Sequence, residues 1–263
     1  MACQSWLKRM FWQTPKHAQT RFDPFDSAPL VPTNLFHTVV HLACSNPGAT
    51  NANTAASNTW SLFKGPSNVT TWDTNKLYYY ESGIPWASNI VDLVGLLANH
   101  NGNCMSWCTL LQNAWQANGI VSATNIVASP NQYLLVKNWA ANSPSVTNNP
   151  PYSYLLLLTP YAGTAWTTAS NPSGGNGDMN NIIGADGQNS PTPAEKIFGR
   201  HFILSLNGIY YDPSYGLTYT NAADFQAQAV AGFAVSNNVT NGTYQMNVKL
   251  PTNTVEIDIS PFP

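Results

Sequence analysis

Two short stretches of the sequence carry side chains that could do covalent chemistry together. Residues 199–216 read GRHFILSLNGIYYDPSYG and place a histidine and an aspartate on either side of an Asn-Gly pair. Residues 100–108 read HNGNCMSWC and place a cysteine directly after a glycine-containing turn. A thiol that is activated by an imidazole, itself oriented by a carboxylate, attacks acyl carbons. These residue types therefore indicate a cysteine nucleophile with a histidine base.

The Asn207-Gly208 pair predicts a two-residue type I′ hairpin turn. In that register His201 and Asp212 are diagonal neighbours on one face of the hairpin, with Cβ atoms about 7–8 Å apart or less. A hydrogen bond can span that gap and would fix the tautomer of the imidazole. The hairpin alone leaves a second interpretation open, in which both are polar residues of the sheet edge with no joint role.

Cys104 is expected to begin an amphipathic helix over 104–117, which ends at Asn118-Gly119. A helix N-terminus favours a thiolate and offers N–H donors for an oxyanion. Cys108, one turn later, is expected to be a small core residue, and a core role is the alternative for Cys104 as well. His100, Cys104 and Cys108 could be read as metal ligands, but Gly102 interrupts the helix between them. No metal and no cofactor is therefore predicted.

Together the two stretches resemble the transglutaminase-like superfamily, a branch of the papain-like cysteine enzymes. The shared features are a Gly-x-Cys turn that opens a helix ending in Gly-Ile (102–120), then a histidine-bearing strand and an Asp-Pro on the next strand (201–216). The resemblance implies Cys104 as nucleophile, His201 as general base and Asp212 as orienter. It also implies a protein or peptide substrate and cleavage of an amide or peptide bond, with hydrolysis favoured and amine transfer open.

Two departures from the family pattern bear on this interpretation. Cys108 stands where a small residue such as alanine is usual. The second oxyanion donor is not defined, and Trp86, Trp60 and Gln188 are the candidates for that donor or for the cleft. Each has a plainer interpretation, as a core aromatic for the tryptophans and as part of a linker for Gln188. The alternative function is a catalytically inactive extracellular binding or structural module on the same fold.

The elements around these residues predict an α+β domain, in which helices come first and an antiparallel sheet follows. The resemblance implies that this domain has a papain/transglutaminase-like core, with the helix of the nucleophile packed on the sheet. Residues 1–34 are expected to be irregular, 35–220 to form the core, and 221–263 to add strands to the same domain. The predicted strands cover 35–42, 120–128, 133–139, 152–159, 244–250 and 254–259, besides the hairpin. The predicted helices are one running into Trp60, one capped by Asp73, one starting at Ser88, the 104–117 helix and 222–230, and residues 160–198 form a long connection.

Composition excludes some functions. Only 8% of the residues are charged and the formal net charge is -2, so no basic surface for nucleic acid is expected. No apolar stretch approaches the roughly 18 residues that cross a membrane. Four cysteines allow one optional disulfide, and whether it involves Cys44 or Cys108 is open. Low charge and sequons at Asn68, Asn238 and Asn241 suit an extracellular protein. The start of the chain lacks a signal-like apolar stretch, which argues against it, so localisation and oligomeric state stay open.

Overall fold

The computed structural model describes residues 36–65, 69–79, 92–129, 133–136, 167–170, 187–189, 197–236, 245–249 and 251–262. Helices and antiparallel sheets are combined in these residues, which confirms the α+β class. The helices are α2 (His37–Cys44), α3 (Ala52–Ser61), α4 (Leu93–Asn99), α5 (Cys104–Gln116) and α7 (Ala222–Ala229). The strands are β1 (Tyr78–Tyr79), β2 (Asn101–Gly102), β3 (Ala123–Ala128), β4 (Tyr133–Val136), β5 (Thr167–Ser170), β6 (Ile197–Phe198), β7 (His201–Leu206), β8 (Ile209–Asp212), β9 (Leu217–Tyr219), β10 (Val230–Ser236), β11 (Gln245–Lys249) and β12 (Asp258–Pro261).

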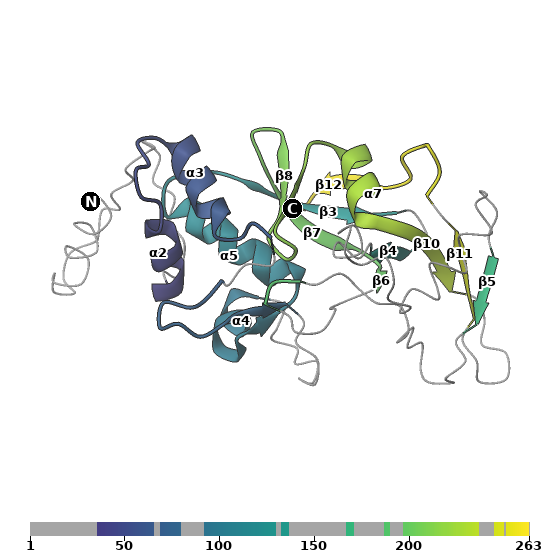
Figure 1. The fold of residues 1–263 in the computed structure, drawn as a ribbon, viewed down its shortest axis with the longest axis horizontal. Coiled ribbons are helices and arrows are strands. Elements are labelled where there is room, and N and C mark those ends of the chain that lie inside the picture. Colours follow the sequence, from purple (N-terminus) through teal and green to yellow (C-terminus); the bar gives the residue numbers. More distant parts are fainter. Residues whose placement is uncertain are drawn as a thin grey trace, which may run out of the picture.

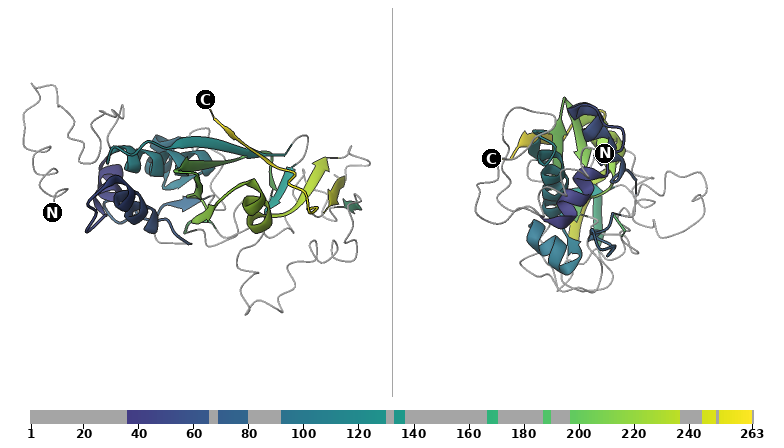
Figure 2. Two further views of the ribbon diagram at one scale, coloured as in Figure 1. Left: turned by 90° about the horizontal axis from the view of Figure 1, so that it is seen from above. Right: turned by 90° about the vertical axis from the view of Figure 1, so that its left-hand side faces the viewer.

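Two five-stranded antiparallel sheets dominate the arrangement. The central sheet has the strand order β12-β3-β7-β8-β9, and the second sheet has the order β5-β11-β10-β4-β6. Helices α2 to α5 gather on one side of the central strands, and the second sheet extends on the other side (Figure 1). Figure 2 shows the same elongated layout from above. The hairpin β7–β8 therefore lies between the helices and the second sheet.

Helix α5 is the central helix of the fold, and its sequence explains its limits. The Asn103 side chain caps it by accepting the Ser106 N–H at 3.1 Å, and Gly119, with φ 78°, ends the turn that follows it. Its predicted apolar stripe is fully buried: Trp107, Leu110, Leu111, Ala114 and Trp115. The helix contacts β7 as well as α2, α3 and α4, so it holds Cys104 in fixed relation to the hairpin.

Two predicted elements are wrong. The predicted strand 35–42 is helix α2, in which Val39, Leu42 and Ala43 are buried and which packs on α5. This packing outweighs the β propensity of the valines. Asp73 does not cap a helix: it accepts hydrogen bonds from the Thr71 hydroxyl and the Asn75 amide in a turn, and the chain then enters β1.

Other predictions are confirmed with shifted limits. The helices at α3, α5 and α7 and the strands at β3, β4, β11 and the hairpin form as expected. The helix expected from Ser88 is α4, which is capped by Asp92, whose carboxylate accepts the Gly95 N–H at 2.6 Å. The last strand is β12, which begins four residues and ends two residues further along than the predicted 254–259. The 160–198 connection contains β5 and β6. Ser88 and the segments 1–34 and 152–159 lie outside the described residues.

Candidate active site

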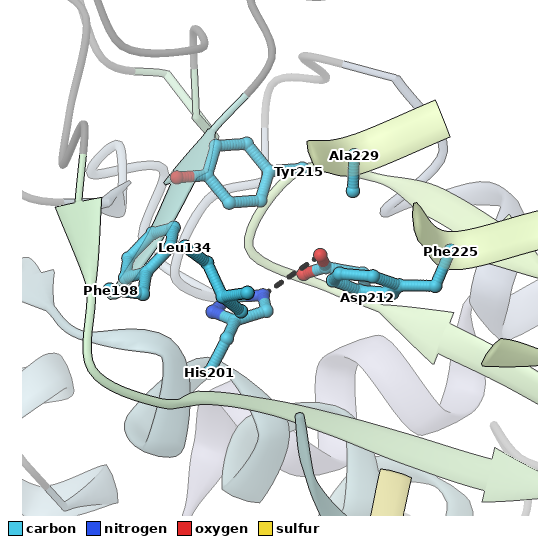
Figure 3. Close-up of a pocket in the computed structure, with 7 residues that line it drawn as sticks. All are labelled: Leu134, Phe198, His201, Asp212, Tyr215, Phe225 and Ala229. Carbon is cyan, nitrogen blue, oxygen red and sulfur yellow. Dashed lines mark hydrogen bonds and ion pairs between the residues drawn. The ribbon is translucent and has the colours of Figure 1, made fainter. Parts of the chain in front are cut away.

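The hairpin turn forms as the Asn-Gly pair predicts. Asn207 and Gly208 have φ values of 51° and 78°, and Leu206 pairs with Ile209. His201 and Asp212 are consequently diagonal neighbours, and His201 Nε2 lies 2.9 Å from Asp212 Oδ2 (Figure 3). Both side chains are buried, each with a relative exposure of 1%. The register that the turn sets therefore brings an imidazole and a carboxylate into direct contact in the interior.

The turn after β8 fixes the Asp212 carboxylate. Its second oxygen, Oδ1, accepts the Ser214 N–H at 3.2 Å, and its backbone carbonyl accepts the Gly216 N–H at 2.8 Å. A side-chain oxygen that accepts a hydrogen bond from the N–H two residues on forms an Asx turn, and the Asp-Pro-Ser sequence is a local signal for such a turn. Gly216 has φ 67°, and a Cβ there would lie 2.3 Å from the Phe63 and Gly65 carbonyl oxygens. The turn therefore packs closely against the backbone of residues 63–65, far away in the sequence.

Aromatic and aliphatic side chains enclose the His201–Asp212 pair. The rings of Phe198, Tyr215 and Phe225 have centroids 4.9, 5.7 and 6.4 Å from that of His201. With Leu134 and Ala229 they line a small pocket beside the pair (Figure 3). Their positions in the sequence gave no pattern that linked them to His201. The pair is therefore kept in a surrounding of low polarity, where its electrostatic interaction is strong.

The environment of His201 favours its charged form. Burial alone lowers the pKa of the imidazole, but the charge and hydrogen bond of Asp212, followed by the hydrogen bond and charge of Cys104, raise the pKa of His201 to about 10. With Nε2 on Asp212, Nδ1 is the remaining nitrogen, and it has no hydrogen bond of ordinary geometry within the described residues. After Asp212, Cys104 is the second group that raises the pKa of the His201 ring. Both groups favour the imidazolium over the neutral ring.

Cys104 is the first residue of α5 and a free thiol with a relative exposure of 6%. The Asn103 side chain accepts a hydrogen bond from the Ser106 N–H, and the Asn103 backbone carbonyl accepts one from the Trp107 N–H. The N–H groups of the first helical residues have no partner within the helix itself, so the Cys104 N–H can serve as an oxyanion donor.

The other cysteines have different states. Cys108 is fully buried and free, and burial, followed by the charges of Cys104 and Asp212, raises the pKa of its thiol well above 9.0. It therefore stays a neutral thiol, in line with the predicted core role. Cys44 is disulfide-bonded.

Of the three residues predicted as oxyanion or cleft candidates, Trp60 and Gln188 belong to the described residues, and both are buried. Trp60 is a buried aromatic whose ring lies parallel to Phe63 and edge-on to Tyr211, at 6.3 and 5.1 Å. The Gln188 amide donates to the Phe63 carbonyl at 2.6 Å and the Gly65 carbonyl at 3.2 Å. Trp86 lies outside the described residues. Gln188 thus ties the 187–189 turn to the segment that also seats Gly216.

The described part of the chain offers no metal-binding cluster and no helix that could span a membrane. No group of three or more His, Cys, Asp or Glu side chains that could hold a metal ion is found there. None of the helices described is long and apolar enough to cross a membrane. Comparison of the chain with protein-family models, curated proteins and solved structures finds no match.

Proposed function

We propose that the protein is a cysteine-dependent enzyme that transfers the acyl group of an amide or peptide bond. Cys104 is the nucleophile, His201 the general base and Asp212 the residue that orients the imidazole. One observation carries the proposal. The buried His201 ring is hydrogen-bonded to Asp212 through Nε2, and Cys104 is among the groups that raise the pKa of His201 to about 10. The resemblance of the two motifs to transglutaminase-like enzymes supports the same assignment and suggests a papain-like core.

The reaction follows from these groups. The reactive form is the Cys104 thiolate beside the His201 imidazolium, which forms when the thiol gives its proton to the ring. The sulfur then bonds to the carbonyl carbon, the carbon–nitrogen bond breaks, and the His201 imidazolium gives its proton to the leaving amine. The Cys104 N–H stabilises the oxyanion formed on the way. Water then attacks the thioester, His201 takes the proton of the water, and the carbon–sulfur bond breaks to release an acid. An amine in place of water would give a new amide, but hydrolysis is favoured because water needs no pocket of its own.

The burial of the site favours a second candidate. Cys104 and His201 have relative exposures of only 6% and 1%, whereas a nucleophile must meet its substrate. A binding or structural module that has lost catalysis on the same fold would keep the three side chains as a packed polar cluster. The two candidates differ in one measurable property, which is the reactivity of the Cys104 thiol.

The test is the pH dependence of alkylation by iodoacetamide, with mass spectrometry to separate Cys104 from Cys108. If the protein is a cysteine enzyme, iodoacetamide should label Cys104 quickly at about pH 6. His201→Ala should slow this labelling at least tenfold, because the imidazolium no longer stabilises the thiolate. Cys108 is the internal control and should stay unlabelled in the folded protein. Slow labelling of Cys104 at about pH 6 in both proteins, rising only at alkaline pH, would refute the enzyme and favour the module.

A further inference from the structure

Three neighbouring strands of the central sheet carry polar side chains at corresponding positions. Asp212 on β8 pairs with Leu217 on β9, so Tyr219, two residues on, points to the same face as Asp212. Tyr219 is therefore a diagonal neighbour of Asp212 on one side, as His201 is on the other. Its relative exposure is 1%, and its ring lies against Phe225 with centroids 4.5 Å apart. The row runs from tyrosine through aspartate to histidine.

The Tyr219 hydroxyl is a buried polar group without a clear hydrogen-bond partner among the described residues. It forms no hydrogen bond of ordinary geometry there, although buried phenol groups almost always find a partner. Burial, and then the charge of Asp212, raises the pKa of Tyr219 well above 10.0, with smaller effects from the Tyr215 charge, a hydrogen bond to Asp212 and the Asp224 charge. The phenol consequently stays protonated and is a donor beside a carboxylate.

We propose that Tyr219 is a positioning residue of this site, whose hydroxyl donates to the Asp212 carboxylate and so sets how Asp212 holds His201. The inference rests on the proposed function. With the Ser214 N–H on Oδ1 and His201 on Oδ2, the phenol is a third donor to one carboxylate. A third donor limits rotation of the carboxylate and draws negative charge away from the oxygen that faces His201.

This arrangement predicts the direction of one shift. Tyr219→Phe removes only the hydroxyl, so Asp212 keeps more negative charge for the imidazolium and the pKa of His201 rises. We expect a rise of about 1, the order of magnitude for the loss of one hydrogen bond to a charged group. The other titratable groups around the row stay in place: Cys104 and Cys108 on α5, Tyr215 in the turn and Asp224 on α7.

The measurement is an NMR titration of ¹³C-labelled histidine, with the His201 signal assigned by its loss in His201→Ala. Tyr211→Phe is the matched control, because Tyr211 lies on the same strand as Asp212 but faces Trp60 and Trp115, at 5.1 and 5.0 Å. We expect a raised pKa of His201 in Tyr219→Phe and the wild-type value in Tyr211→Phe. An unchanged or lowered pKa in Tyr219→Phe overturns the proposal.

A second measurement covers a Tyr219→Phe protein that does not fold. A ¹³C-tyrosine titration of Asp212→Asn should place the ionisation of Tyr219 at lower pH than in the wild type, because the neighbouring charge is gone, and no change overturns the proposal. Cys104 labelling of the wild-type protein separates the two hypotheses. An ordinary thiol together with a raised pKa of His201 refutes the enzyme and leaves the Tyr219–Asp212 contact standing. An activated thiol with an unchanged pKa refutes only the role of Tyr219.

Discussion

The charge of the buried His201 ring makes the stability of the fold depend on pH in a definite direction. Although burial opposes it, Asp212 and then Cys104 raise the pKa of His201 from 6.5 to about 10. A pKa that is higher in the folded than in the unfolded state stabilises the fold fully below the unfolded value, and this stabilisation is lost as the pH rises toward the folded value. We therefore expect the free energy of unfolding to fall between pH 6.5 and about 10.

The size of the effect follows from the two pKa values. One proton held by the folded state and not by the unfolded state changes the free energy of unfolding by about 1.4 kcal/mol per pH unit. Integrated from about pH 6.5 to 8.5, the loss is up to about 2 kcal/mol. The experiment uses Cys104→Ser, so that the pH dependence at this site comes from the His201 ring, and because the contribution of Cys104 to the pKa of His201 is then absent, about 2 kcal/mol is an upper value. It stops at about pH 8.5 because Cys108, with its raised pKa, adds a loss of the same sign above that pH.

The assay is urea unfolding followed by tryptophan fluorescence at about pH 6.5, 7.5 and 8.5. The control is Cys104→Ser combined with His201→Gln, which has no titrating ring at this position and should show little change over the range. A free energy of unfolding that stays constant in Cys104→Ser, or that falls equally in the double variant, would contradict the assignment of a buried imidazolium held by Asp212.

Two further predictions concern the seating of the turn that carries Asp212. Gly216→Ala should destabilise the protein by several kcal/mol, because φ is 67° and the new Cβ would lie 2.3 Å from two carbonyl oxygens, whereas Gly48→Ala, at φ 77° with nothing within 4 Å, should cost only about 1 kcal/mol by urea unfolding. Gln188→Ala should cost about 2 kcal/mol, because the Phe63 and Gly65 carbonyls lose their amide donor, and it should also slow Cys104 labelling at about pH 6. Gln188→Glu should destabilise the protein more in the same urea unfolding assay, since it would set a carboxylate against those carbonyls, and a neutral effect of either change would show that the hydrogen bonds of Gln188 are unimportant.

Local sequence signals were sufficient to predict the pair at the centre of the site. The Asn207-Gly208 turn sets the register of β7 and β8, and the alternation of side chains then places His201 and Asp212 on one face. Helix α5 was equally accessible, because its apolar positions recur at helical spacing and Gly119 marks its end. Helix α2 could not be predicted from the sequence, because Val39 and Val40 favour a strand locally and only packing against α5 makes this segment helical.

The sequence alone determined which chemical groups the site contains and the spacing of two of them along a hairpin, because turns and helix ends depend on neighbouring residues. The tertiary structure decided what surrounds them. Phe198, Tyr215 and Phe225 enclose His201 from different elements, and Gln188 joins segments more than a hundred residues apart. Such contacts carry no local signature, since they arise only when the sheets and helices bury their apolar faces together. Burial opposes the charge on His201, but the charge and hydrogen bond of Asp212, followed by those of Cys104, outweigh it and keep the imidazole protonated.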